Sequence, residues 1–213
     1  MKRIFIILTA SLMTIISMYA QDLQDVKLNN PSKSRGSDIM KALSDRQSIR
    51  EYDAKELSLQ DLSDLLWAAN GINREDGKRT APSAMNMQEI DVYLINKDGA
   101  YFYDPATHTL KGLTPGDYRK AVAASQDFAA TAPVCIVLVG NLEKFRDPAA
   151  ANNRVTAAMD AGIVSQNINI FCSATGMATV PRGTMNNDEL KTILKLSDTQ
   201  ELMLNNPVGF PKK

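Results

Sequence analysis

The chain has 213 residues, of which 44% are hydrophobic and 23% charged, with 24 basic and 24 acidic side chains. This balance argues against a nucleic-acid or anionic-membrane binder, and the composition is ordinary for a globular domain with a sizeable core. With two cysteines, no Cys-x-x-Cys motif and a single histidine, His108, the chain offers no usual zinc site or histidine-based triad. Cys135 and Cys172 each lie in an apolar run, so we expect buried free thiols.

Residues 1–20 have the pattern of an export signal. Lys2 and Arg3 precede an apolar run at 4–18 that is short for a membrane span, and Ala20 offers a cleavage position. An uncleaved anchor is the less favoured alternative. Cleavage would leave a slightly acidic protein, free of the membrane, in the periplasm of a Gram-negative bacterium.

Beyond the signal, helical and extended patterns alternate without a linker or a change in composition. Residues 21–36 are polar and predict a loosely attached lead-in, and residues 37–213 predict one α+β domain.

Two helices are expected in the first part of this domain. Ser37 is a candidate N-cap for a short helix that ends near residue 43. Ser58 caps a clearer helix whose leucines follow helical spacing, and Asn70 with Gly71 predicts a left-handed stop.

The remaining elements are predicted from strand alternation, apolar runs and turn residues. The long apolar helix among them carries little charge and should be buried on most sides. In chain order we expect a strand (90–95), a hairpin with His108 in its solvent-facing turn (101–113), a helix (118–130), a buried strand (134–139), the long helix (155–175), a short strand (178–181), a helix (188–196) and a last strand (201–210).

The segment DRQSIREYD, residues 45–53, places Arg46, Ser48 and Arg50 at alternate positions. In extended backbone these side chains share a face, and two guanidiniums with a hydroxyl suit a phosphate group. The alternative is a solvated turn in which the arginines pair with neighbouring acids, and the segment alone favours that alternative.

The terminal Lys212 and Lys213 follow a turn that contains Gly209 and Pro211. If the last strand enters the sheet near Arg46, these lysines would complete an anion pocket. A frayed terminus is the alternative.

The loop APSAMN, residues 81–86, has small side chains and one amide that both donates and accepts. Such a loop is able to lie flat against a planar heterocycle. The segment 176–186, GMATVPRGTMN, is a second place where glycine permits a ligand to approach the backbone.

Taken in order, these segments resemble the FMN-dependent nitroreductase family. The Arg-x-Ser-x-Arg segment is followed by a helix ending LLWAANG, then RTAPSAMNMQ, a strand and hairpin, QDFAATAPVCIVLVG, DAGIVSQNINIFCSATGMAT and a terminal VGFP. The resemblance covers residues 37–213 and is closest to the branch that includes the SagB-type dehydrogenases. It implies a central, mainly antiparallel sheet flanked by helices, in a homodimer with flavin at the subunit interface.

The resemblance also assigns cofactor-binding residues, and it assigns no catalytic side chain because the flavin performs the redox chemistry. The implied residues are Arg46, Gln47, Ser48 and Arg50 at the phosphate and ribityl chain; Pro82, Ser83, Ala84, Met85 and Asn86 in the loop that the second subunit lays against the flavin; Gln126 at the pyrimidine edge; the backbone of Pro181, Arg182 and Gly183 facing N5; and Lys212 or Lys213 at the phosphate.

The implied activity is transfer of hydride from NADH or NADPH through flavin N5 to a small organic acceptor, such as a nitroaromatic or a quinone. One alternative is an FMN-dependent dehydrogenase or electron carrier with a different donor, because an exported protein meets little nicotinamide. The other is a non-catalytic module that binds flavin or another ligand.

Overall fold

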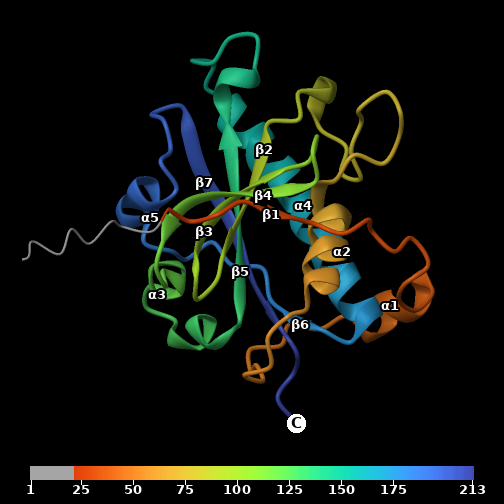
Figure 1. The fold of residues 1–213 in the computed structure, drawn as a ribbon. Coiled ribbons are helices and arrows are strands. Elements are labelled where there is room, and N and C mark those ends of the chain that lie inside the picture. The colour runs from red at the N-terminus through yellow and green to blue at the C-terminus, as the bar shows by residue number, and fades with distance from the viewer. Residues whose placement is uncertain (1–21) are drawn as a thin grey trace, which may run out of the picture.

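The computed structural model describes residues 22–213, and the expected signal at 1–20 lies outside this part of the chain and remains a prediction. The described residues form one seven-stranded sheet in which every strand pair is antiparallel. Helices cover both faces of the sheet (Figure 1). The predicted α+β class and mainly antiparallel sheet are confirmed.

The sheet has the order β1-β4-β3-β2-β5-β7-β6, so β2, β5 and β7 lie side by side near its centre. The strands are β1 (Val26–Lys27), β2 (Ile90–Ile95), β3 (Gly99–Asp104), β4 (Thr109–Pro115), β5 (Val134–Asn141), β6 (Ala178–Thr179) and β7 (Gln200–Gly209).

Strands β2 and β5 are apolar along most of their length because both of their faces are buried, whereas β7 also buries the polar Asn205 and Asn206. Leu94 of β2 and Ile136 of β5 belong to the larger core cluster, which also contains residues of two long helices. Their neighbours Ile95 and Val137 point to the opposite face, where shorter helices cover a second cluster.

The longest helix, α4, packs on β5 and β7 and contacts both α1 and α2, while α3 and α5 lie on the other face. Within the described residues, no helix is both long and apolar enough to cross a membrane. The helices are α1 (Ile39–Asp45), α2 (Leu59–Asn70), α3 (Arg119–Ala123), α4 (Asn153–Thr175) and α5 (Asn187–Ile193), with 3-10 turns η1 (Ala84–Asn86), η2 (Asp127–Thr131) and η3 (Leu142–Lys144).

The helix predicted over 118–130 is wrong, because the chain turns out of the helix at Ala124. Ala124 has a φ of 50°, and a 3-10 turn begins three residues later. The carbonyls of Val122 and Ala123, which would continue the helix, instead accept hydrogen bonds from the side chain of Arg182.

The helix caps match the predictions at one of three positions. Ser58 forms the expected cap of α2, as a capping box with Asp61. Asp38 rather than Ser37 caps α1, through the amide of Lys41. Gly71 is extended, with φ −76° and ψ 161°, so the expected left-handed stop is also wrong.

The lead-in at 21–36 is firmly attached where the structure describes it, which contradicts the prediction. Its strand β1 pairs with β4, and Leu28 is buried in the main core. Arg35 forms ion pairs with Asp61 at 2.5 Å and Asp64 at 3.0 Å, both on α2. The ion pairs of Arg35 involve polar side chains, and β1 is only two residues long, so the apolar pattern of the sequence does not show this attachment.

Candidate functional site

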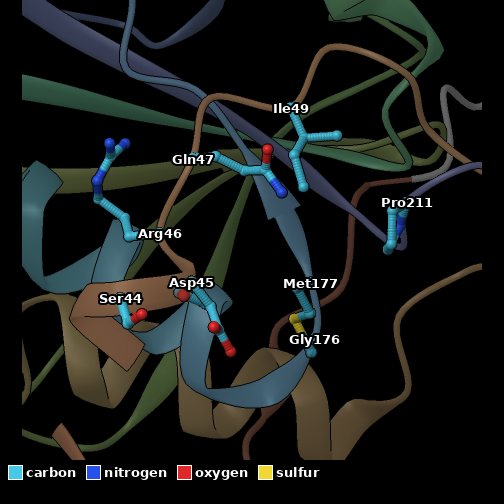
Figure 2. Close-up of a pocket in the computed structure, with 9 residues that line it drawn as sticks. Ser44, Asp45, Arg46, Gln47, Ile49, Gly176, Met177 and Pro211 are labelled. Carbon is cyan, nitrogen blue, oxygen red and sulfur yellow. The ribbon is translucent and has the colours of Figure 1, made fainter. Parts of the chain in front are cut away.

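The larger of two neighbouring cavities opens at the end of α1. Its volume is about 490 Å³. Figure 2 shows Gln47 and Ile49 on one side, with Gly176 and Met177 below them and Pro211 across the opening. The lining residues are Ser44, Asp45, Arg46, Gln47, Ile49, Ser173, Gly176, Met177 and Pro211.

The smaller cavity, of about 230 Å³, lies beside the same segment of chain. It collects residues from three separate parts of the sequence, including four predicted site positions besides Arg50. The lining residues are Arg50, Gln126, Phe128, Val180, Pro181, Arg182, Gly183 and Thr184.

Backbone hydrogen bonds fix the segment 46–53 between β6 and the C-terminus. The amide of Ile49 donates to the carbonyl of Thr179 at 3.1 Å, and that of Asp53 donates to Phe210 at 2.8 Å. The amide of Lys212 in turn donates to Glu51 at 3.2 Å. The last strand therefore ends beside the arginine segment, which was the condition for the terminal lysines to join an anion pocket.

Arg46 and Arg50 do not pair with their neighbouring acids. Asp45 pairs with Lys41 at 2.7 Å, and Asp53 accepts the amide of Lys55 at 2.8 Å. In the described chain, no carboxylate lies within 4.0 Å of either guanidinium. The alternative of a self-paired basic turn is therefore not what this segment adopts.

The expected convergence of the alternate residues is not seen. Arg46 lines the larger cavity and Arg50 the smaller one, while Ser48 is exposed and lines neither. In Figure 2 the guanidinium of Arg46 points away from Pro211. The two charges therefore border two adjoining spaces rather than one point.

The side chain of Arg182 is a feature that the sequence did not predict, since only its backbone was assigned. It is 6% exposed and donates to Gln126 Oε1 at 2.8 Å, to Asn205 Oδ1 at 2.8 Å and to the carbonyl of Ala123 at 2.9 Å. Burial lowers the pKa of Arg182. All these acceptors are neutral, so the buried charge gives a positive potential at the smaller cavity.

The contact with Arg182 also determines how Gln126 meets this cavity. The amide oxygen of Gln126 accepts from Arg182, whereas its amide nitrogen donates to no other group among the described residues. Gln126 therefore presents a hydrogen-bond donor at the smaller cavity.

The predicted loop at 82–86 has an unusual backbone that is held from both sides. Met85 and Asn86 have φ values of 51° and 56°, and the Met85 side chain is 77% exposed. The amide of Ala84 donates to Asp160 Oδ2 at 2.8 Å, and that of Gln88 donates to Ser83 Oγ at 2.8 Å. Non-glycine residues with positive φ are costly and persist only where other contacts hold them.

This loop and the arginine segment lie at opposite ends of α4 (Figure 1). Asp160 holds the loop, whereas Ser173 holds the end of α1 through the carbonyl of Ala42 at 2.7 Å. The interval from Asp160 to Ser173 corresponds to about 20 Å of helix. One subunit alone therefore does not bring the loop to the larger cavity, which Ser173 lines.

The remaining candidate groups are structural. Cys135 and Cys172 are free and buried as predicted, and burial raises the pKa of Cys135 to about 12, which keeps it unreactive. His108 is half-buried, with Nδ1 2.9 Å from Tyr103 Oη, so the predicted solvent-facing position is wrong. Residues 22–213 contain no cluster of His, Cys, Asp or Glu suited to a metal ion.

Comparisons with known proteins agree with this architecture. The sequence model of the Nitroreductase family matches residues 43–210. A protein of Methanocaldococcus jannaschii, described as a candidate nitroreductase, is 29% identical over 197 residues, covering 88% of this chain and 97% of that one. The crystal structure of a candidate nitroreductase from Ralstonia eutropha has a TM-score of 0.84 at 33% identity, covering 90% of this chain and 91% of that chain. A candidate NADH oxidase of Clostridium acetobutylicum shares the fold at 20% identity, with a TM-score of 0.57, covering 83% of this chain and 89% of that chain.

Proposed function

Because the chain belongs to the nitroreductase family, we propose that it is an FMN-dependent oxidoreductase that transfers hydride from NADH or NADPH, through flavin N5, to a small organic acceptor such as a nitroaromatic or a quinone. The observation that carries this proposal is the pair of cavities along one segment of chain, the larger lined by Arg46 and the smaller by Arg50, neither of which forms an ion pair within the described residues. A ligand with an anionic end and a planar end fits such a site better than a small anion does.

The residues of the larger cavity fit a phosphate and a flexible polyol chain. A phosphate monoester carries about −1.5 to −2 charge at neutral pH, and arginine matches its oxygens. Within the described residues, no carboxylate lies within 4.0 Å of Arg46 in this cavity or of Arg50 in the smaller one. Lys212 and Lys213 extend from the C-terminal segment beside them. Gln47 in this cavity, and the exposed Ser48 beside it in the chain, would add polar groups for the hydroxyls.

The residues of the smaller cavity fit the electron-rich edge of the ring. When bound, FMN would supply the redox chemistry, accepting and releasing hydride at N5. Gln126 would donate a hydrogen bond to the pyrimidine edge, because Arg182 occupies its oxygen. The buried charge of Arg182 would favour negative charge on the reduced ring, and the backbone of Pro181 and Gly183 would line the side where hydride passes.

A complete site requires two subunits in this proposal. The loop Pro82–Ser83–Ala84–Met85–Asn86 would come from the second subunit, because about 20 Å of α4 separates it from the larger cavity of its own chain. Its backbone is already held in shape by Asp160. The proposed assembly is a homodimer with flavin at the interface.

The proposed export signal would favour a second candidate function. A protein outside the cytoplasm meets little nicotinamide, so a flavin-dependent dehydrogenase or electron carrier with a different donor fits the apolar run at 4–18. Membership of the SagB-type branch, which includes dehydrogenases, would fit this second candidate. In a third candidate the cavities bind flavin or another ligand without turnover.

Absorption spectra of the mature protein with added FMN separate these candidates. Flavin bands that bleach with NADH or NADPH under anaerobic conditions would support the nicotinamide-driven oxidoreductase. Bands that persist would favour the second candidate. Purified protein that retains no flavin bands, even after FMN is added, would contradict the flavin proposal.

A further inference from the structure

Glu89 is a buried acid that forms no ion pair with any described residue. It lies between the loop and β2, its exposed fraction is 0%, and neither carboxyl oxygen has a hydrogen-bond donor in the described structure. Lys144 does not neutralise it, because its ammonium contacts Asp91 Oδ1 at 2.8 Å and the carbonyl of Gln88 at 2.9 Å. Arg79 forms no ion pair with Glu89 either, and the Nε of Arg79 is buried without a hydrogen-bond partner in the described part of the chain.

A second carboxyl group, that of Asp160 on α4, lies beside Glu89. It lies within hydrogen-bonding reach of Glu89, and Asp160 is itself only 7% exposed. Two carboxylates that face each other away from water cannot both remain ionised, because repulsion and lost hydration disfavour the doubly charged state. A single proton between them removes the repulsion and supplies the missing donor.

Asp160 is also the group that holds the loop. Its Oδ2 accepts the amide of Ala84 at 2.8 Å, one residue before the first of the left-handed positions Met85 and Asn86. A strained backbone of this kind depends on its anchors. The orientation of Asp160 therefore links the protonation of Glu89 to the shape of the loop.

We propose that Glu89 and Asp160 share one proton and act as positioning residues for residues 82–88, so that the shape of this loop depends on that proton. The inference goes beyond the proposed function, because it concerns the loop whether or not a flavin is bound. In a flavoprotein dimer it would make the contribution of the second subunit dependent on pH.

The direction of the pH effect follows from the position of Glu89. Burial and the neighbouring Asp160 raise the pKa of Glu89 from 4.5 to about 7, against smaller opposing effects of the Glu89 backbone amide and of Lys144. The folded chain therefore holds a proton that the unfolded chain has lost, so this contribution to stability falls as pH rises from 4.5 toward 7. Above that range Glu89 ionises in the folded chain and repels Asp160. Among the other charges nearby, Asp91 adds to this repulsion, whereas Lys144 and Arg79 attract the ionised Glu89.

Hydrogen exchange of the peptide containing residues 82–88, measured by mass spectrometry as protection factors, tests this proposal. In the wild type we expect the loop protection to fall about tenfold from about pH 6 to about pH 8, because roughly a tenth of Glu89 stays protonated one unit above its pKa. Glu89→Gln does not ionise, and its amide still donates to Asp160, so its loop should stay protected throughout. Asp160→Ala should lose protection at both pH values.

Glu75→Gln is the matched control, since it makes the same chemical change in an exposed loop and should behave as the wild type. A wild-type loop whose protection does not change with pH would overturn the proposal. An unchanged pH dependence in Glu89→Gln would also overturn it. Neither result needs bound FMN, so failure here is distinguishable from failure of the proposed function.

Discussion

The guanidinium of Arg182 connects three parts of the chain that are distant in sequence. It donates hydrogen bonds to the carbonyls of Val122 and Ala123 at the end of α3, and to Asn205 Oδ1 on β7. It also orients Gln126 at the smaller cavity. One buried cation thus determines where a helix ends and which atom of a candidate ligand-binding residue remains free.

Replacing Arg182 by alanine should destabilise the protein strongly. Each buried acceptor left without its donor costs about 1–3 kcal/mol, and Arg182→Ala leaves several. We expect the free energy of unfolding to fall by about 3 kcal/mol or more in urea titrations. Arg146→Ala, at an exposed arginine with no hydrogen bond or ion pair in the described chain, should change it by less than about 0.5 kcal/mol. A loss for Arg182→Ala as small as this control would contradict the structural role.

The arginines at the cavities should act on cofactor affinity rather than on folding. Arg46 and Arg50 are exposed and make no ion pair within residues 22–213, so the double variant Arg46→Ala/Arg50→Ala should fold as the wild type does. A charge-assisted contact is worth about 1.5–3 kcal/mol, so losing even one should raise the Kd for FMN about tenfold or more. Fluorescence titration measures this Kd, with Arg146→Ala as the control. An unchanged Kd in the folded double variant would show that the phosphate lies elsewhere.

At the scale of elements, a helix or strand boundary was predictable from sequence where neighbouring residues set it, and was missed where distant residues set it. Strand β2 was predicted at both ends, and β5 within two residues, because burial of both faces leaves a mainly apolar run in the sequence itself. Strand β7 was predicted within one residue at each end, although it contains polar residues such as Asn205 and Asn206. The end of α3 was missed because Arg182, about 60 residues further along, causes it. The lead-in was missed because a two-residue strand and a single buried Leu28 produce no periodicity.

Gly71 gives an element-scale prediction in which the reason for a glycine matters. A Cβ on Gly71 would lie 2.5 Å from Trp67 Cδ1 and 2.8 Å from Trp67 Cα, so the glycine provides space at the end of α2. We expect Gly71→Ala to lower the free energy of unfolding by about 1–3 kcal/mol, the usual range for overpacking. The same change at Gly183, where nothing lies within 4 Å, should be nearly neutral in the same urea titration. Equal effects at both glycines would remove the steric explanation.

At the scale of the whole molecule, the site was predictable as a set of segments but not as an arrangement. The arginine segment and the C-terminus were expected to meet, and the amide of Lys212 does donate to Glu51. The separation of Arg46 from Arg50 was not expected, because it depends on how Ile49 hydrogen-bonds to Thr179. Such contacts arise only when distant strands have assembled.

An apolar stripe on α4 indicates which surface of the chain we expect to lie at a subunit interface. The long helix was expected to be buried on most sides, yet Val155, Met159 and Ile163 are exposed at helical spacing. The stripe adjoins the loop, because Asp160 beside Met159 holds Ala84. An exposed apolar stripe beside a loop that lies far from the larger cavity of its own chain is the surface we expect a second subunit to cover.

Met159→Lys tests this surface and the shared site together. Met159 is 61% exposed, so a lysine there should leave the monomer folded while placing a charge in the centre of the expected interface. Sedimentation should then show a shift from dimer to monomer, and FMN affinity should fall with it, because the loop of the second subunit is lost. Leu59→Lys is the matched control, an exposed leucine at the start of α2 that should leave both measurements unchanged. A Met159→Lys protein that remains dimeric would place the interface elsewhere, and a monomer that keeps its FMN affinity would show that each chain builds its site alone.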